Sequence, residues 1–340
     1  MVPTMRTEAP AFDLLSPDLI LDAVESAFDV FLTSVVTPYS SYINRVYGLE
    51  TDDGERFVVK FYRPDRWTTN AILEEHRFIT DCVEAELPVV SPITNAAGST
   101  LQCAVAMDDE GITDEGARFF FALFPHRGGR QFDAERDEDW IRLGSVVARL
   151  HQVGKMRTAP SRRIFTPAET TSRQLEELRT GGVVHPDVAP EFFGIVDSVL
   201  ERISPGFDGL DAQRIHGDCH RGNILDRPGE GLMLIDFDDM LTGPVVQDIW
   251  LLLPDYAESA YRELELIMEG YEQFARFDRA TLRLVEPLRF MRMIHYLAWA
   301  SRQRFDGRFR ESFPDWGGKA FWIKEVEDLQ VQERVISGTG

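Results

Sequence analysis

The sequence predicts an α+β protein with two lobes: a β-rich N-terminal lobe that carries one helix, and a larger, mainly helical C-terminal lobe. Three observations support this prediction. β-rich runs gather before residue 125, helical periodicity dominates after residue 132, and a Gly-Gly pair lies between the two regions. We therefore expect the lobes to comprise residues 1–125 and 126–340.

The N-terminal lobe contains a predicted hairpin. Two β-rich runs, at 45–50 and 56–63, are separated by the turn-forming letters "TDDGE". Residues 68–86 follow with apolar side chains at helical spacing, and 118–124 form a third β-rich run. The stretch 125–132 has no periodicity, so it is predicted to be an irregular linker between the lobes.

Helices are predicted to dominate the C-terminal lobe. Helical patterns occupy 139–152, 191–203, 244–253, 258–277 and 279–302. The last of these contains Pro287, which predicts a kink or a split because proline cannot donate a helical hydrogen bond. Two short β segments are predicted in "QRIHGD" and "LMLIDF", each beside a polar loop.

Composition and charge restrict the function. The 340 residues are 44% hydrophobic and 27% charged, as in ordinary globular proteins. A net charge of −21 argues against a general binder of nucleic acid or anionic membranes, since both require a basic surface. The N-terminal stretch has no signal-peptide core, no apolar run approaches membrane-spanning length, and the three cysteines are widely spaced. A cytoplasmic location is therefore expected.

The densest group of reactive side chains lies in the nine letters "HGDCHRGNI". His216, Asp218 and Asn223 stand at the H-x-D-x-x-x-x-N spacing of a kinase catalytic loop. A metal cage built from His216, Cys219 and His220 fits less well. Structural zinc needs a second pair of ligands, and c-type haem needs C-x-x-C-H.

A second motif, "LIDFDDM", supports phosphoryl transfer. Asp236 follows an apolar strand, which is where kinases place a magnesium ligand. In this pattern Asp218 accepts the proton of the substrate hydroxyl, while Asn223 and Asp236 bind Mg²⁺, because hard cations prefer oxygen ligands. We therefore predict Asp218 and Asp236 as catalytic residues.

The N-terminal lobe offers matching candidates for ATP binding. Lys60, in the apolar run "FVVKFY", is the only lysine among the first 150 residues, and it is predicted to hold the α- and β-phosphates. Glu75 lies on the apolar stripe of the following helix, with Ile72 and Ile79, so it is predicted to orient Lys60. Glu74 lies off that stripe.

The loop that would cover the phosphates is less clear. The sequence has no G-x-G-x-x-G before the lysine, and "TPYSSYINRVY" stands in its place. Ser41 and Asn44 are predicted to offer hydroxyl and N–H groups to phosphate oxygens. An ordinary polar turn is the alternative interpretation.

These motifs resemble the aminoglycoside phosphotransferase and choline kinase superfamily, and more closely the stress response kinase A family. The resemblance rests on "SSYINRVY", "RFVVKFYRPDRW", "GGRQF", "HGDCHRGNIL", "GPVVQDIWLLL" and "EPLRFMRMIHYLAW", and it spans almost the whole chain. It implies a two-lobed protein-kinase-like fold and a monomeric cytoplasmic enzyme that uses ATP and Mg²⁺. It also implies Ser41 at the ATP site, Asp238 beside the metal and Asp248 as a structural brace.

The family resemblance implies a serine/threonine protein kinase of the stress response type. No long activation segment or A-P-E follows Asp236, so a kinase for a small hydroxylated or amino metabolite is the alternative. A pseudokinase that only binds partners is a third hypothesis, which intact Lys60, Asp218 and Asn223 argue against. We expect autophosphorylation and a preference for basic protein substrates, given the acidic chain.

Cys219 is either a redox switch or a small packing residue.

Overall fold

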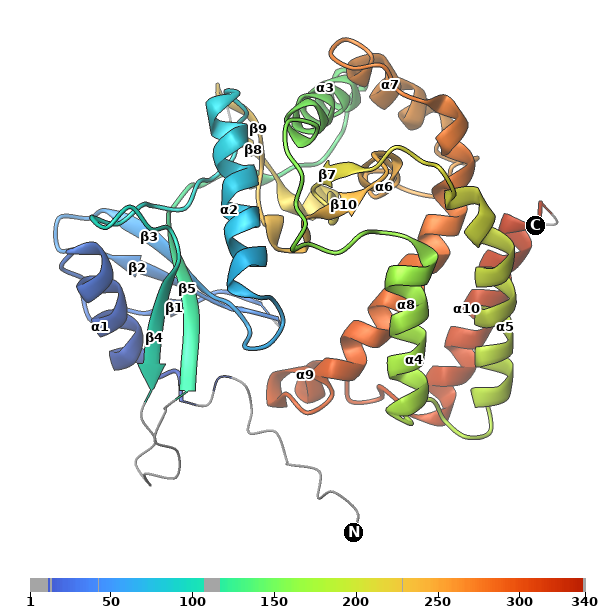
Figure 1. The fold of residues 1–340 in the computed structure, drawn as a ribbon, viewed down its shortest axis with the longest axis horizontal. Coiled ribbons are helices and arrows are strands. Elements are labelled where there is room, and N and C mark those ends of the chain that lie inside the picture. Colours follow the sequence, from blue (N-terminus) through green and yellow to red (C-terminus); the bar gives the residue numbers. More distant parts are fainter. Residues whose placement is uncertain (1–11, 13, 42, 107–116, 228, 339–340) are drawn as a thin grey trace. The chain divides into compact units, whose positions relative to one another are not determined.

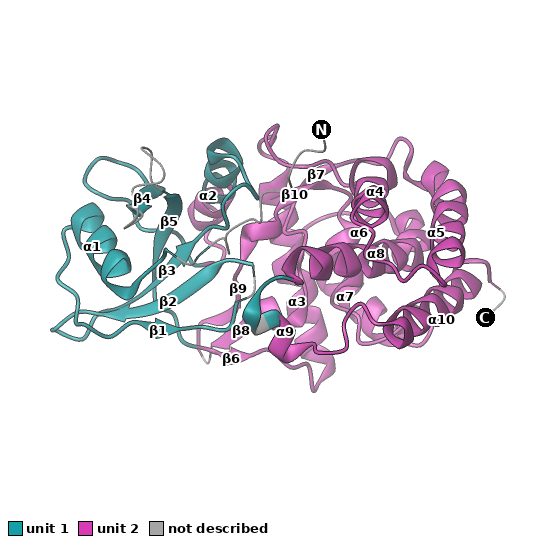
Figure 2. Cartoon of the chain, turned by 90° about the horizontal axis from the view of Figure 1, so that it is seen from below, with its two compact units in different colours: residues 1–77, 90–128, 305–309 teal, residues 78–89, 129–304, 310–340 magenta. Residues whose placement is uncertain are grey.

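The structure is a computed structural model that describes residues 12, 14–41, 43–106, 117–227 and 229–338 (Figure 1). Tyr42, in the predicted phosphate loop, and most of the N-terminal stretch considered above lie outside the described residues. The chain forms two compact units (Figure 2). Unit 1 comprises residues 1–77, 90–128 and 305–309, and unit 2 comprises 78–89, 129–304 and 310–340. The lobe boundary at 125/126 stays a prediction.

Unit 1 is built on a five-stranded antiparallel sheet with the strand order β1-β2-β3-β5-β4. The strands are β1 (Thr37–Pro38), β2 (Arg45–Glu50), β3 (Arg56–Phe61), β4 (Gln102–Ala106) and β5 (Ala117–Pro125). The predicted hairpin is β2 and β3, in a register that places Val46 opposite Lys60. The third predicted run is β5, which pairs with both β3 and β4.

One face of this sheet is covered by α1 (Pro17–Phe28), a helix that the sequence did not predict (Figure 1). Ser16 caps it by accepting a hydrogen bond from the backbone N–H of Leu19. The stacked rings of Phe61 and Phe121, with centroids 5.1 Å apart, lie in the apolar core beneath it. This core fixes β3, the strand that carries Lys60.

Helix α2 (Thr69–Glu84) is the predicted helix after the hairpin. Thr68 Oγ1 accepts a hydrogen bond from the backbone N–H of Ala71 at its first turn. The first half of the helix, with Ile72 and Glu75, belongs to unit 1. Phe78, in the second half, belongs to the apolar core of unit 2.

Unit 2 is mainly helical, as predicted. Its helices are α3 (Asp137–Gly154), α4 (Ser172–Thr180), α5 (Ala189–Ile203), α6 (Val246–Trp250), α7 (Tyr261–Tyr271), α8 (Val285–Gln303) and α10 (Lys319–Ile336), while α9 (Gly307–Ser312) is shared with unit 1. Its short strands are β6 (Arg130–Gln131), β7 (Gln213–Ile215), β8 (Ile224–Arg227), β9 (Gly231–Leu234) and β10 (Leu241–Gly243). The strands form a three-stranded sheet in the order β6-β8-β9 and a separate β7-β10 pair.

Helices α3 and α7 pack closely because each contributes a glycine to their interface. A Cβ on Gly144 would lie 2.0 Å from the carbonyl oxygen of Ile267, and one on Gly270 would lie 1.9 Å from that of Ile141. Both distances are far below any real contact, so only glycine fits. This packing positions His151 on α3, which supports the polar loop described below.

Several predicted elements differ from the structure in detail. The split expected within 279–302 is present, but it falls where a 3₁₀ helix (Arg279–Leu284) is followed by α8, and not at Pro287. Pro287 lies in the first turn of α8, where a missing N–H removes no intrahelical hydrogen bond. The stretch expected to be irregular contains β6, whose residues pair with β8. The predicted helix at 258–277 is shorter, since α7 ends at Tyr271.

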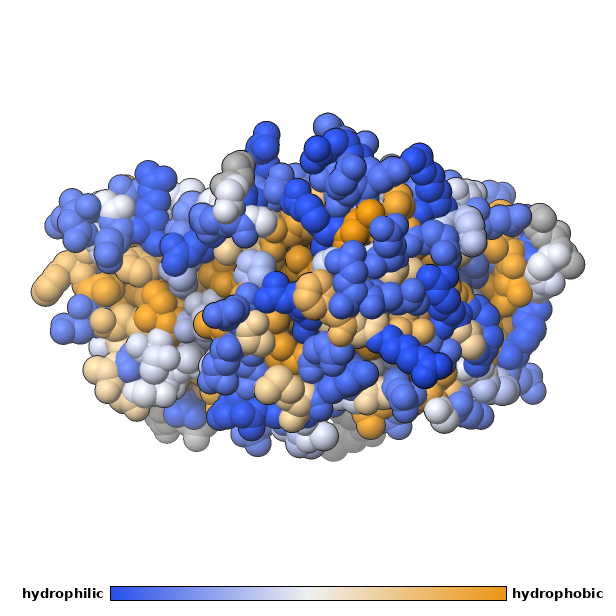
Figure 3. All heavy atoms as spheres, turned by 90° about the horizontal axis from the view of Figure 1, so that it is seen from above, coloured by the Kyte–Doolittle hydropathy of each residue, from blue (hydrophilic) through white to orange (hydrophobic). Residues whose placement is uncertain are grey.

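Hydrophilic residues cover most of the face drawn in Figure 3, between smaller hydrophobic patches. Many of the surface charges are paired, as in the ion pair between Lys319 Nζ and Asp187 Oδ2 at 2.6 Å. Among the described residues, no helix is both long and apolar enough to cross a membrane.

Candidate active site

Asp218 lies in the polar loop after β7 and is mostly buried, with a side chain that is 17% exposed. Arg292 Nη2, from α8, donates to its Oδ1 at 2.7 Å. Asn223 Nδ2 lies 3.4 Å from Oδ2, and His220 Nε2 lies 3.5 Å from the same oxygen. Three donors therefore surround the carboxylate that the sequence predicts to be the base.

This environment keeps Asp218 ionised. Burial raises the pKa of Asp218, but the hydrogen bond from His220 and the charges of Arg292 and His220 lower that pKa by more. The net result is a pKa well below the usual 3.8. A carboxylate that stays ionised at neutral pH meets the first requirement of a residue that accepts a proton from a hydroxyl.

Asp248, at the start of α6, holds the loop in place. Its Oδ2 accepts a hydrogen bond from the backbone N–H of His216, and its Oδ1 accepts one from that of Gly217, both at 2.8 Å. His151 Nε2 lies 3.0 Å from Oδ2, and the Asp248 side chain is fully buried. Gly217 has a φ of +81°, and a Cβ there would lie 2.2 Å from the carbonyl oxygen of Asp239. The two residues before Asp218 are thus tightly constrained.

Asn223 directly precedes β8, and Asp236 lies two residues after the end of β9. The carbonyl oxygen of Asn223 accepts a hydrogen bond from the backbone N–H of Ile235 at 3.0 Å, which places Asp236 one residue away from that contact. Asn223 Nδ2 donates to the carbonyl oxygen of Asp218 at 2.9 Å, so the amide oxygen of Asn223 is turned away from that bond. Asp236 is exposed and has a left-handed φ of 60°, a strained conformation that is concentrated at functional sites.

This donor set fits magnesium. Mg²⁺ is typically bound by one or two protein oxygens together with substrate phosphates and water, rather than by a full protein cage. Asn223 and Asp236 supply an amide and a carboxylate oxygen on adjacent backbone segments. In the described part of the chain, no group of three or more His, Cys, Asp or Glu residues could hold a metal ion. Asp238 is buried in the 3₁₀ turn that follows Asp236.

Lys60 and Glu75 pair within unit 1. Lys60 Nζ, from β3, lies 3.4 Å from Glu75 Oε1, from α2, and both side chains are nearly enclosed. The glutamate is the one on the apolar stripe, as expected, and not Glu74. The role of the pair in binding ATP stays a prediction, since Lys60 and Glu75 belong to unit 1 while Asp218, Asn223 and Asp236 belong to unit 2.

Two neighbours of this pair were missed in the sequence. The hydroxyl of Tyr62 lies 3.4 Å from Glu75 Oε1 and 2.9 Å from His76 Nε2, and the ring of Tyr62 lies 4.9 Å from Lys60 Nζ. His76 Nδ1 in turn lies 2.7 Å from Thr100 Oγ1. Their closeness in the sequence could have indicated them, because Tyr62 is two residues after Lys60 and His76 directly follows Glu75.

The side chain of Asn44 and the backbone carbonyl of Ser41 accept hydrogen bonds from arginines near the hairpin. Asn44 is 5% exposed, and its Oδ1 accepts a hydrogen bond from the backbone N–H of Arg63 at 3.1 Å. The carbonyl oxygen of Ser41 lies 3.4 Å from Arg45 Nη1. The side-chain oxygen of Asn44 is therefore already committed, and the predicted contacts of both residues with ATP stay predictions.

Cys219 is a buried free thiol beside the proposed base. Burial, with the nearby charges of Asp248 and Asp218, raises the pKa of Cys219 well above its ordinary value. Redox-sensing cysteines need the opposite, an accessible side chain and a stabilised thiolate. The structure therefore supports the packing interpretation of Cys219 and not the redox switch.

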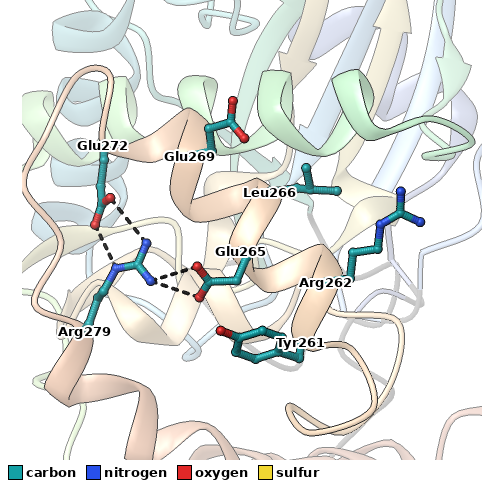
Figure 4. A pocket seen from close by; sticks show the side chains of 7 residues that line it. All are labelled: Tyr261, Arg262, Glu265, Leu266, Glu269, Glu272 and Arg279. Carbon is teal, nitrogen blue, oxygen red and sulfur yellow. Dashed lines mark hydrogen bonds and ion pairs between the residues drawn. The ribbon is translucent and has the colours of Figure 1, made fainter.

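A hollow of about 500 Å³ on α7 lies away from these residues (Figure 4). Arg279 Nη1 lies 2.9 Å from Glu265 Oε1, and Arg279 Nε lies 3.0 Å from Glu272 Oε1. Glu265 and Glu272, two of the glutamates that line the hollow, are thus paired with the protein's own Arg279.

Comparison with known proteins indicates the same class of enzyme as the geometry of the site. The phosphotransferase enzyme family matches residues 35–285. Stress response kinase A of Escherichia coli (strain K12) is 36% identical over 333 residues, which cover 98% of this chain and 97% of that protein. The serine/threonine protein kinase RdoA of Salmonella typhimurium (strain LT2) is 34% identical over the same shares. The chain belongs to the phosphotransferase enzyme family, and it is an ATP-dependent kinase.

Solved structures confirm the predicted α+β, two-lobed protein-kinase-like fold. Amicoumacin kinase, solved with AMP-PNP, Ca²⁺ and amicoumacin, superimposes with a TM-score of 0.71 at 19% identity and covers 93% of both chains. A microcompartment-associated aminopropanol kinase gives a TM-score of 0.66 at 17% identity, over 94% of this chain and 98% of the other. A spectinomycin phosphotransferase gives 0.62 at 13% identity, over 93% and 98%.

Proposed function

We propose that this kinase transfers the γ-phosphoryl group of magnesium-bound ATP to serine and threonine hydroxyls of proteins, itself included. The observation that carries the proposal is the mostly buried Asp218, which lies beside Asn223 in the H-x-D-x-x-x-x-N loop and is contacted by Arg292. The names of the whole-chain relatives support a protein acceptor and a role in stress response. A monomeric enzyme in the cytoplasm is part of the same proposal.

Each residue has a defined task in this reaction. The acceptor hydroxyl forms a new O–P bond to the γ-phosphorus while the bond from that phosphorus to the bridging β-phosphate oxygen breaks, and ADP leaves. Asp218 takes the hydroxyl proton. Lys60, oriented by Glu75, would bind the α- and β-phosphates. Asn223 and Asp236 would hold Mg²⁺, which offsets phosphate charge when bound.

The test is transfer of labelled phosphate from ATP to a basic model protein, followed by identification of the modified amino acid. We expect phosphoserine or phosphothreonine on the added protein and on the kinase, with weaker labelling as salt rises because charge steering is screened. The Asp218→Asn variant serves as the background control. If the purified enzyme labels no protein, itself included, a protein acceptor is excluded.

A small hydroxylated or amino metabolite is the alternative acceptor, and one observation favours it. The chain between Asp236 and α6 forms only a 3₁₀ turn and the short strand β10 before α6 begins at Val246. This leaves little room for the long segment on which protein kinases seat a peptide. Consumption of ATP with one added metabolite, and no labelled protein, would establish this alternative.

A further inference from the structure

Arg292 is a basic side chain from a distant helix, α8, that contacts the proposed base. Its Nη2 donates to Asp218 Oδ1 at 2.7 Å, and its side chain is only 34% exposed. Among the described residues, Asp218 is its hydrogen-bonding partner, and the other N–H groups of the guanidinium make no hydrogen bond. A guanidinium has five N–H donors in a fixed planar arrangement, so several remain available to a ligand.

The position of these donors restricts the acceptor. A hydroxyl that gives its proton to Asp218 must lie within hydrogen-bonding reach, about 2.6–3.2 Å, of an Asp218 oxygen. A hydroxyl that approaches Oδ1, the oxygen that Arg292 contacts, brings the substituents on its carbon next to Arg292. A carbonyl or carboxylate oxygen there can accept from the unused N–H groups, whereas an ammonium group would meet a like charge.

The neighbouring histidine on α8 does not alter this preference. His295 lies one turn along α8, and its Nδ1 is 2.8 Å from Gln174 Nε2, from α4. Burial and the charge of Arg292 lower the pKa of His295 to about 4, against the opposing influence of Asp239 and Asp218. His295 is therefore neutral at physiological pH and adds no positive charge beside Arg292.

We propose that Arg292 determines the acceptor class: it binds a carbonyl or carboxylate oxygen next to the reacting hydroxyl, as in a peptide-linked serine or threonine, and it disfavours an amino alcohol with an ammonium group there. The inference rests on the proposed function, because it requires Asp218 to receive the hydroxyl. It also separates this chain from its structural neighbour that is named an aminopropanol kinase.

The test compares two acceptors at saturating ATP and magnesium: an end-blocked peptide with a single serine, and 1-amino-2-propanol. In Arg292→Gln, we expect the peptide KM to rise about tenfold or more and the peptide-to-amino-alcohol ratio of kcat/KM to fall by a similar factor, while the KM for ATP is unchanged. Arg292→Lys should recover part of the peptide preference. Arg302→Gln, on the same helix, removes a surface pair with Glu177 and should leave the ratio unchanged.

The outcomes distinguish the inference from the function on which it rests. A wild-type enzyme that prefers the amino alcohol, or an unchanged ratio in a folded Arg292→Gln, overturns the role of Arg292 and leaves the kinase intact. A wild-type enzyme that phosphorylates neither acceptor nor any protein overturns the proposed function instead. Should Arg292→Gln not fold, competition in the wild type decides: N-acetylserine amide must inhibit peptide phosphorylation at a lower concentration than 1-amino-2-propanol.

Discussion

The Lys60–Glu75 pair of unit 1 and the Asp218 loop of unit 2 are assembled in different ways. Lys60 and Glu75 come from one strand and the next helix, only 15 positions apart in the sequence. Asp218 depends on α6 through Asp248, on α3 through His151 and on α8 through Arg292, with contacts that span up to 97 positions. The first site therefore requires local structure, and the second requires the correct packing of three helices.

The largest effect on stability is expected at the brace of the loop. Asp248→Ala removes the acceptor of two backbone N–H groups and of His151, all in a fully buried position. Leaving buried donors unsatisfied costs about 1–3 kcal/mol for each, so unfolding free energy should fall by roughly 3–5 kcal/mol. Chemical denaturation measures this change.

The matched control is Asp197→Ala, which removes an exposed partner of Arg179. Surface pairs of this kind contribute about 0–1 kcal/mol, so its unfolding curve should stay near that of the wild type. Equal losses in the two variants would mean that Asp248 does not brace the loop.

Breaking the Lys60–Glu75 pair should destabilise the protein less than Asp248→Ala does, and a second substitution should recover part of the loss. Lys60→Met removes the cation that pairs with the buried carboxylate of Glu75, which we expect to destabilise the protein by about 3 kcal/mol. The double variant Lys60→Met, Glu75→Leu should recover much of this loss, because an apolar pair replaces the buried charges. ATP binding should not recover in the double variant, since the phosphate-binding cation is absent. Denaturation and nucleotide titration of both variants check these two expectations separately, and recovered ATP affinity would contradict the assigned role.

These differences explain how much the sequence could predict. The β2–β3 hairpin, Lys60 and the choice of Glu75 followed from local patterns, since alternation, turn residues and helical spacing act over a few residues. The roles of Arg292 and His151 could not be found this way, because their contacts depend on how distant helices pack. The N-cap and apolar stripe of α1 were present in the sequence but were not recognised.

A smaller effect is expected at Tyr62, which joins Glu75 to His76. Tyr62→Phe keeps the ring beside Lys60 and removes only the hydroxyl, so stability should fall by about 1 kcal/mol. The KM for ATP should rise modestly, because Glu75 loses one of the groups that hold it. Thermal unfolding and steady-state kinetics measure both. A variant with unaltered stability would show that this hydroxyl contributes nothing to the pair.

The smallest effect is expected at Cys219. Its thiol is enclosed and, because its pKa is raised, protonated at neutral pH. Iodoacetamide should therefore modify exposed Cys103 in the native protein and leave Cys219 unmodified, as peptide mass analysis would show. Wild type and Cys219→Ser should lose activity equally under peroxide. Protection by the substitution would restore the redox-switch hypothesis.

The most direct test of the account is the rate of phosphoryl transfer by Asp218→Asn, measured together with its affinity for magnesium-bound ATP. The amide keeps the size of the side chain but cannot accept the hydroxyl proton as a carboxylate does. We expect nearly unchanged nucleotide affinity and a rate that falls by about 10²–10⁴-fold, the usual contribution of a general base. Transfer at the wild-type rate would contradict the assignment of Asp218 as the proton acceptor.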